Sequence, residues 1–262
     1  MKLDLYQVDA FTGAIFGGNP ACVMPLTEWL PDELLLKIAK ENAVAETAFF
    51  IDNGVTIHLR WFTPEFEMDL CGHATLATAH CLKTILGYKT NEFVFTSLSG
   101  NLIVSADKDV YTLNFPAREP VMAVLPDFIK QSLNIQPAEV WQSRDYMLVY
   151  NNQADIMNIT IDRNRFDQVN LDPGGVIITA RGNEVDFVSR FFTPQASILE
   201  DPVTGSAHCS LIPYWAKKLG KNEMMALQLS ERLGKLGCVY KGDRVLISGQ
   251  ARTYFIGAIW TD

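Results

Sequence analysis

The sequence is poor in cysteine, carries no excess of positive charge and contains no long apolar run. Its five cysteines are an odd number without a CxxC pair, so we expect reduced thiols in the cytoplasm rather than a disulfide framework. The 30 Asp and Glu outnumber the 22 Lys and Arg, and a formal net charge of −8 disfavours nucleic acid as a partner. No apolar run approaches the roughly 18 residues of a membrane-spanning helix, so no membrane partner is expected.

The sequence also lacks the short patterns that hold common cofactors. Neither GxGxxG nor GxxxxGK[ST] occurs, which disfavours a nicotinamide or a P-loop nucleotide, and the absence of GxSxG disfavours a serine hydrolase. There is no HExxH, and His73 and His80 stand seven residues apart, two helical turns, which is too far for a compact metal site. We therefore predict no cofactor and no metal, and we interpret His80, Cys81, His208 and Cys209 as core or helix-face residues.

An internal repeat is the strongest feature that the sequence does contain. Arg60-Trp-Phe-Thr-Pro64 recurs as Arg190-Phe-Phe-Thr-Pro194, at an offset of 130 residues. Two further landmarks recur in the same order at offsets of 133 and 134: Gly72-His-Ala74 with Gly205-Ser-Ala207, and Gly100-Asn-Leu102 with Gly234-Lys-Leu236. Such collinear landmarks predict a duplication into two similar domains. We expect a pseudo-two-fold axis between the domains and a small-molecule site in the cleft that they form.

Each half reads as many short strands and one long helix rich in small residues. In the first half we predict helices at 31–42 and 72–86, the second ended by Gly87, and strands at 3–8, 21–24, 47–51, 56–62, 93–96, 100–106 and 110–115. In the second half we predict a helix at 204–219, ended by Gly220, and strands at 146–151, 175–180, 186–192, 226–230, 234–241 and 243–248.

These elements predict an α/β (α+β) protein of two similar, pseudo-symmetric domains. Each domain is expected to be a mostly antiparallel curled sheet or barrel around a central helix. The region from Pro116 to Pro126 is the natural boundary, which gives an N-terminal half-domain of 1–117 and a C-terminal half-domain of 118–250. The strand-like run from Thr253 to Trp260 is expected to return within 251–262 and complete the first half.

The two predicted helix starts carry the best candidate chemistry. Glu67-Met-Asp-Leu-Cys-Gly-His-Ala-Thr75 leads into one helix and Glu200-Asp-Pro-Val-Thr-Gly-Ser-Ala-His208 into the other. Glycine at a helix N-terminus lets a ligand approach free backbone N–H groups, which suits a carboxylate or phosphate. The alternative is ordinary capping, because Asp69 and Asp201 are good residues before a helix. The recurrence of the pattern in both halves favours a binding function.

Several titratable residues are candidates for proton transfer. Glu46 lies in an otherwise apolar run, where partial burial would suit an acid/base role, although a surface position at a helix end is the alternative. His73 is a candidate acid/base or anion donor, or simply a polar residue of the first helical turn. Asp201 is its counterpart in the second half, and Ser206 is a candidate anion donor or a cap. Cys71 at a helix start is expected to have a lowered pKa and to be able to act as a base.

Five motifs together resemble the phenazine-biosynthesis isomerase family (PhzF-like). They occur in the family's order over essentially the whole chain: Phe16-Gly-Gly-Asn-Pro-Ala21, Asn42-Ala-Val-Ala-Glu-Thr-Ala-Phe49, Arg60-Trp-Phe-Thr-Pro64, Leu70-Cys-Gly-His-Ala-Thr-Leu76 and Glu200-Asp-Pro-Val-Thr-Gly-Ser-Ala207. The family is similar in fold to diaminopimelate epimerase and proline racemase. The resemblance therefore implies two alike domains, each with a sheet around a central helix, and a homodimer.

The resemblance also implies cofactor-independent proton transfer on a small carboxylate-bearing substrate. The family's catalytic residues match Glu46, which would take and return the proton, and His73 and Asp201, which would position the substrate. Phenazine-pathway members move a proton between ring carbons of a dihydro-hydroxyanthranilate. As an alternative function we keep a non-catalytic protein that binds small anions in the same cleft.

The helix-start residues match the family's carboxylate-binding positions. These are Gly72, Gly205 and Ser206, and Cys71 beside them is a further candidate for substrate binding. Two-cysteine epimerases of the wider superfamily place one thiol where Cys71 stands and the second near Pro202, where this chain has none. Racemisation by paired thiols is therefore not predicted.

Overall fold

The computed structural model describes residues 1–171 and 174–262, and the chain divides into two compact units. The first unit comprises residues 1–115 and 247–262, and the second comprises 116–246. The strands predicted at 243–248 and 253–260 are in fact one uninterrupted strand, β17 (Arg244–Trp260), which begins in the second unit and ends in the first. The predicted interruption at 249–252 does not occur, because Gly249 continues the strand where it lies against Phe11.

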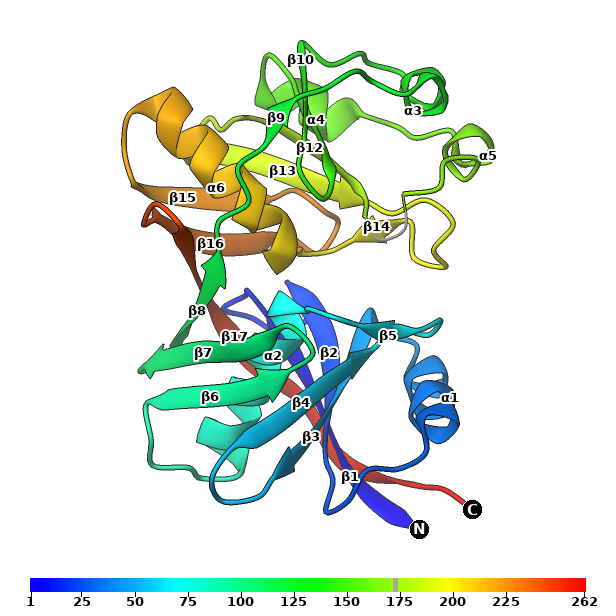
Figure 1. Cartoon of the computed structure of the whole chain (residues 1–262), viewed down its shortest axis with the longest axis vertical. Coiled ribbons are helices and arrows are strands. Elements are labelled where there is room, and N and C mark those ends of the chain that lie inside the picture. The colour runs from blue at the N-terminus through cyan, green and yellow to red at the C-terminus, as the bar shows by residue number, and fades with distance from the viewer. Residues whose placement is uncertain (172–173) are drawn as a thin grey trace. The chain divides into compact units, whose positions relative to one another are not determined.

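The first unit consists of strands around one central helix (Figure 1). Its elements are β1 (Lys2–Ala10), β2 (Asn19–Pro25), α1 (Asp32–Asn42), β3 (Glu46–Asp52), β4 (Ile57–Phe62), β5 (Glu67–Met68), α2 (Gly72–His80), a π-helix (Cys81–Ile85), β6 (Glu92–Ser97), β7 (Gly100–Asp107), β8 (Val110–Pro116) and most of β17. The pairings run β1–β2–β3–β4–β6–β7–β8–β17 and return to β1, so the strands close into a barrel.

Helix α2 lies inside this barrel because its residues are small and apolar. Every residue from Gly72 to His80 is buried, and the helix packs against β1, β2, β3 and β7. Ala74, Ala77 and Ala79 allow strands to approach the helix backbone closely on several sides. The helix predicted at 72–86 changes to π geometry after His80 and then ends before Gly87, which has a positive φ of 75°.

The second unit repeats this plan. Its elements are β9 (Val121–Met122), α3 (Asp127–Ser132), β10 (Glu139–Gln142), β11 (Tyr146–Val149), α4 (Gln153–Asn158), α5 (Arg163–Phe166), β12 (Val176–Arg181), β13 (Phe187–Phe192), β14 (Glu200–Asp201), α6 (Gly205–Leu219), β15 (Glu223–Gln228), β16 (Gly234–Tyr240) and the start of β17. Helix α6 is buried from Gly205 to Ala216 and ends at Gly220, whose left-handed backbone lets its N–H reach the Ala216 carbonyl.

Strand pairing is the same in both units, including the uncommon parallel steps. The antiparallel pair β1–β2 corresponds to β10–β11, and the parallel pair β2–β3 corresponds to β11–β12. The parallel pair β4–β6 likewise corresponds to β13–β15, with the central helix between the two strands in the chain. The predicted fold class, two similar units built of curled sheets around a central helix, is confirmed.

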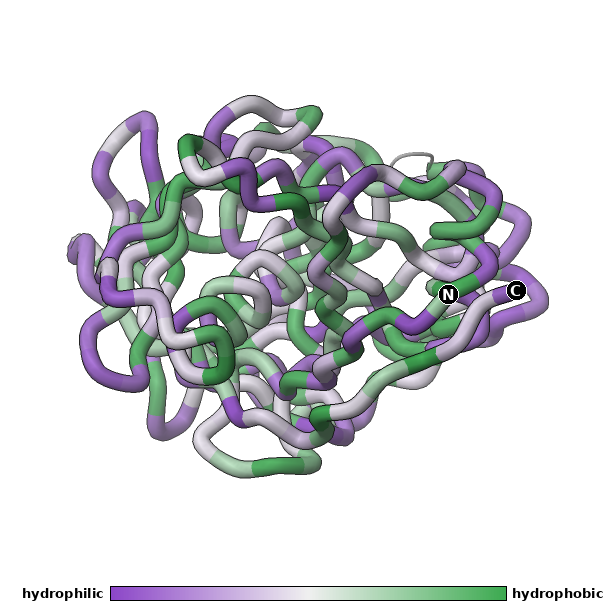
Figure 2. Tube along the Cα trace, turned by 90° about the horizontal axis from the view of Figure 1, so that it is seen from below, coloured by the Kyte–Doolittle hydropathy of each residue, from purple (hydrophilic) through white to green (hydrophobic). Residues whose placement is uncertain are grey.

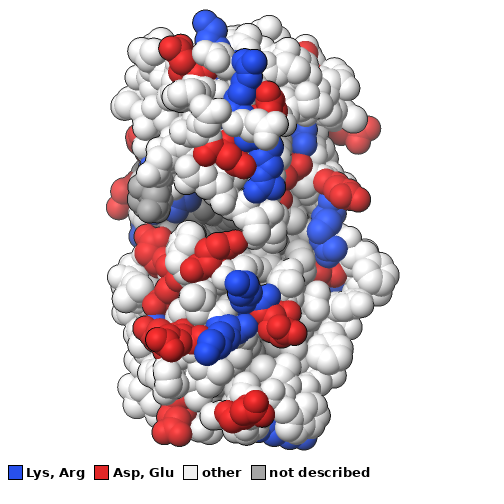
Figure 3. Space-filling view, turned by 90° about the vertical axis from the view of Figure 1, so that its right-hand side faces the viewer, with Lys and Arg blue, Asp and Glu red and all other residues white. Residues whose placement is uncertain are grey.

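Hydrophobic residues gather along the strands, and many outer loops are hydrophilic (Figure 2). Helix α1 covers part of the first sheet with Leu35, Ile38 and Ala39, which belong to a core cluster with Phe49 and Phe62. Charged side chains of both signs are interspersed on the face drawn in Figure 3. Among the described residues, none of the helices is both long and apolar enough to cross a membrane.

Candidate functional site

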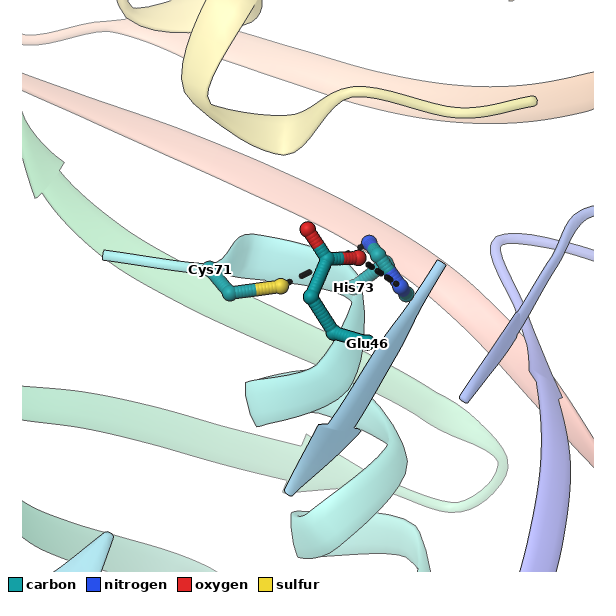
Figure 4. A group of neighbouring side chains, drawn as sticks. All are labelled: Glu46, Cys71 and His73. Atoms are coloured by element: carbon teal, nitrogen blue, oxygen red, sulfur yellow. Dashed lines mark hydrogen bonds and ion pairs between the residues drawn. The ribbon is translucent and has the colours of Figure 1, made fainter. Parts of the chain in front are cut away.

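The candidate site of the first unit forms where β2, β3 and α2 all begin. Strands β2 and β3 are parallel, with Ala21 opposite Glu46, so their first residues lie at the same end of the barrel. Cys71 precedes α2 with extended backbone, and the helix begins at Gly72. Figure 4 shows that Glu46, Cys71 and His73 converge at this helix start. The fold thus brings together residues from two distant segments of the chain.

Close contacts link these side chains. His73 Nε2 lies 3.1 Å from Glu46 Oε2, and Cys71 Sγ lies 3.6 Å from His73 Nδ1. The side chain of His73 is 3% exposed and that of Glu46 is 14% exposed, so His73 is buried and Glu46 is partly buried. The prediction that Glu46 is partly buried is therefore correct, and the surface position at a helix end is not.

The electrostatics of the group favour a charged histidine. Burial by itself lowers the pKa of His73, but the adjacent Cys71 and Glu46 outweigh burial and hold this pKa well above 6.5. Burial, assisted by the Glu46 charge, raises the pKa of Cys71. The expectation of a lowered thiol pKa at the helix start was therefore wrong, because desolvation outweighs the stabilising contacts with His73 and the Ala74 N–H. The Glu46 carboxylate, 3.1 Å from the ring, thus favours the imidazolium form of His73.

The second unit has a different set of residues at the start of its central helix. Gly205 begins α6, and Ser206 Oγ accepts a hydrogen bond of 3.1 Å from Arg144 Nη2. Asp201 Oδ2 accepts a bond of 2.5 Å from Thr204 Oγ1, just before the helix. The Asp201 carbonyl also accepts from Gln228 Nε2. This helix start therefore presents a cationic donor and hydroxyls.

The predicted site residues thus fall into two groups. Glu46, Cys71, Gly72 and His73 come together in the first unit. Asp201 ends β14 and contacts Thr204 in the second unit, where Gly205 and Ser206 then begin α6. That the two helix starts face each other across a cleft stays a prediction.

Two residues with direct contacts to this site were missed from the sequence. Asn19, fully buried at the start of β2, lies with Nδ2 3.1 Å from His73 Nδ1. Asn19 lies in the Phe16–Ala21 motif that supports the family resemblance, but this motif does not reveal a contact with a residue 54 positions away. Arg144 carries no pattern of its own either, and only folding brings it to Ser206.

The remaining His and Cys candidates are buried core residues, as predicted. His80 contacts Tyr111 and Thr253 through its two ring nitrogens, and burial lowers its pKa to about 4. His208 Nδ1 lies 2.9 Å from the Thr204 carbonyl, and its pKa is likewise lowered to about 4 by burial. Cys81 and Cys209 are buried free thiols.

Comparison with known proteins places the chain in one family. The model of the phenazine biosynthesis-like protein family (PhzC-PhzF) matches residues 8–257. A curated relative named an uncharacterized isomerase, from Pseudomonas aeruginosa, is 45% identical over 259 residues, which cover 99% of each chain. The human phenazine biosynthesis-like domain-containing protein is 36% identical over 286 aligned positions, again with 99% of each chain covered.

Solved structures agree with this placement. A crystal structure of a phenazine biosynthesis protein of the PhzF family from Enterococcus faecalis superposes with a TM-score of 0.93, at 42% identity over 100% of both chains. A hydroxyproline epimerase from Agrobacterium vitis gives a TM-score of 0.64 at 10% identity, covering 98% of this chain and 92% of that one, which shows a shared fold. The chain is a member of the PhzC-PhzF family of phenazine biosynthesis-like proteins.

Proposed function

We propose that this protein is a cofactor-independent isomerase or epimerase that moves a proton on a small carboxylate-bearing substrate. The observation that carries the proposal is the 3.1 Å ion pair between Glu46 and His73 at the start of α2. Glu46 is partly buried and can act as a base. The buried His73 beside it can carry a positive charge that stabilises the ionised carboxylate. The isomerase name of the Pseudomonas aeruginosa relative, at 45% identity, supports the reaction class.

In this proposal Glu46 abstracts a proton from a substrate carbon and returns it to another position or face. His73 stabilises the ionised carboxylate before abstraction and orients it. The N–H groups at the start of α2 attract the substrate carboxylate or the negative charge that develops when the proton leaves. Asp201, Gly205 and Ser206 remain candidates for positioning the substrate from the second unit.

The test is solvent deuterium exchange. The purified protein is incubated in D2O with a panel of small carboxylates, and C–H to C–D replacement is followed by mass spectrometry. We expect exchange in the wild type and a loss of about 10²–10⁴-fold in Glu46→Gln, the range typical of general acid/base groups. The matched control is Glu41→Gln, which changes an exposed glutamate at the end of α1 and should keep the wild-type rate. Exchange at the wild-type rate in Glu46→Gln would exclude the proposed role.

A non-catalytic anion-binding protein is the second candidate function. The observation that favours it is the Arg144 guanidinium on Ser206 at the start of α6, since such a donor set binds carboxylates without any acid/base group. It predicts tight binding of a panel carboxylate that is recovered without deuterium at every pH. A homodimer, cytoplasmic location and the cleft between the halves also stay predictions.

A further inference from the structure

The cluster of Glu46, Cys71 and His73 offers three different ligand atoms for a metal ion. With one atom taken from each side chain, the carboxylate oxygen, the thiol sulfur and an imidazole nitrogen all lie within 4.8 Å of one another. The sequence did not predict this group, because His73 was considered there for a metal only with His80, two helical turns along the same helix. Glu46 joins Cys71 and His73 only through the fold.

Each of the two His73 contacts, taken separately, has about the length of a ligand separation in a tetrahedral site. Zinc bonds of about 2.3 Å to sulfur and about 2.0–2.1 Å to nitrogen or oxygen set ligand separations of about 3.5 Å for S···N and about 3.3 Å for N···O. The observed values are 3.6 Å for Cys71 Sγ to His73 Nδ1 and 3.1 Å for Glu46 Oε2 to His73 Nε2. These two contacts use different ring nitrogens, so binding requires a side-chain rotation that turns one nitrogen towards both partners.

Two further observations favour an added ligand. Glu46 Oε2 and His73 Nε2 are buried atoms that lie 3.1 Å apart, and neither has another hydrogen-bond partner among the described residues. Thiolate, imidazole and carboxylate form the donor set of soft to borderline divalent ions such as Zn²⁺ and Cd²⁺. With the thiol and imidazolium protons released to solvent, two anionic ligands neutralise a divalent ion.

We infer that Glu46, Cys71 and His73 form an inhibitory binding site for Zn²⁺ and related soft divalent cations. The bound ion occupies the carboxylate and the imidazole that the proposed reaction needs, so metal binding and proton transfer exclude each other. Only the inhibition rests on the proposed function. The binding site itself rests on the three ligand atoms.

Cadmium titration tests the site without any substrate. Protein freed of metal with a chelator is titrated with Cd²⁺ under anaerobic conditions, and thiolate-to-cadmium charge-transfer absorption is recorded. We expect one equivalent to produce this absorption in the wild type and in Cys238→Ala, which removes a buried thiol of β16 outside the cluster. Cys71→Ser should abolish the absorption, and Glu46→Gln should weaken binding at least about tenfold.

Absence of the absorption in the wild type, or its persistence in Cys71→Ser, would overturn the inference. Should Cys71→Ser fail to fold, as judged by circular dichroism, X-ray absorption on the zinc-loaded wild type decides. One sulfur with nitrogen and oxygen ligands supports the site, whereas ligation by oxygen alone overturns it. Zn²⁺ should also stop deuterium exchange until a chelator is added. Metal binding by a protein that exchanges no panel substrate would count against the isomerase and leave the site intact.

Discussion

The starts of the two central helices have the same backbone and different chemistry. Helices α2 and α6 both begin at a buried glycine after a residue with extended backbone, and neither has a side-chain cap. The next residue is His73 in the first unit and Ser206 in the second. His73 contacts a carboxylate and a thiol, whereas Ser206 contacts a guanidinium. The duplicated scaffold keeps the anion-attracting N-terminus in both units and places an acid–base pair in only one.

The strand register identifies the residue of the second unit that is equivalent to Glu46. Phe49 pairs with Arg60 and Ile178 pairs with Arg190, so the position three residues earlier is Glu46 in one unit and Gly175 in the other. A Cβ atom at Gly175 would lie 2.4 Å from the Phe191 ring, which leaves no room for a side chain. In its present packing the second unit therefore has no space for a glutamate at the equivalent position.

Each unit contains an equivalent arginine–glutamate ion pair, which is a structural feature that the duplication kept. Arg60 binds both carboxylate oxygens of Glu67 at 2.7 and 2.6 Å, and Arg190 binds Glu200 in the same way at 2.7 and 2.8 Å. The first pair joins β4 to the short strand β5, and the second joins β13 to the short strand β14. Both short strands come just before the central helix of their unit. The comparison thus separates structural residues, which recur, from candidate reactive residues, which do not.

The largest expected effect is a difference in activity between variants at the two helix starts. His73→Asn should lower the deuterium exchange rate about 10²–10³-fold, because it removes the charge beside Glu46. Ser206→Ala should lower it about tenfold or less, as expected for the loss of one hydrogen-bonding hydroxyl. Both rates are measured with the same panel substrate. A greater loss in Ser206→Ala would show that the reactive groups are not confined to the first unit.

The histidines of the two helices should respond to pH in opposite directions. His208 has a folded pKa of about 4 against 6.5, so its contribution to the free energy of unfolding is complete above pH 6.5 and is lost as pH falls towards 4. Between pH 6.5 and 4 this loss is on the order of 3 kcal/mol. His73 has a raised pKa, so its contribution is complete below pH 6.5 and is lost as pH rises through its folded value.

Urea unfolding of the wild type, His208→Gln and His73→Asn from pH 4.5 to 10 measures both slopes. We expect His208→Gln to flatten the acid side of the profile and His73→Asn to flatten the alkaline side. Identical profiles for the two variants would contradict the opposite pKa shifts.

The shared ion pairs should be worth nearly the same in both units. Glu67→Gln and Glu200→Gln are each expected to reduce the free energy of unfolding by about 1–2 kcal/mol, since each removes the bidentate carboxylate of a largely buried guanidinium. Arg60 then keeps Asp32 as a partner, and Arg190 keeps the backbone carbonyls of Ile156 and Ile159. The two values should agree within about 0.5 kcal/mol in urea unfolding. A large difference would mean that the two ion pairs, despite their similar geometry, contribute differently to the free energy of unfolding.

The smallest expected effect concerns Asn19, whose buried amide contacts His73 Nδ1. Asn19→Ala should lower the exchange rate about three- to tenfold, the value of one hydrogen bond, and shift its pH profile because the imidazole loses a partner. Asn91→Ala, at an exposed position before β6, is the control and should leave both unchanged. A rate loss without a shifted profile would indicate a role in packing only.

Local patterns were sufficient for most of the fold. Alternating residues predicted the strands, and glycines predicted the ends of both central helices, because these signals depend on neighbours in the chain. The short helices α3, α4 and α5 were missed, since four to six residues show too little periodicity. The raised pKa of Cys71 was missed as well, because the helix-start position is local while burial of the thiol depends on the whole unit.

The sequence by itself determined the duplication, the family and the two helix starts at glycine, because short contiguous motifs identify each of them. Only the tertiary structure decided which side chains meet there. The Glu46–His73 pair joins β3 to α2, Asn19 reaches His73 across 54 residues, and Arg144 reaches Ser206 across 62. Such contacts depend on parallel strand register and on closure of the barrel around a small-residue helix, which bring distant segments within bonding distance.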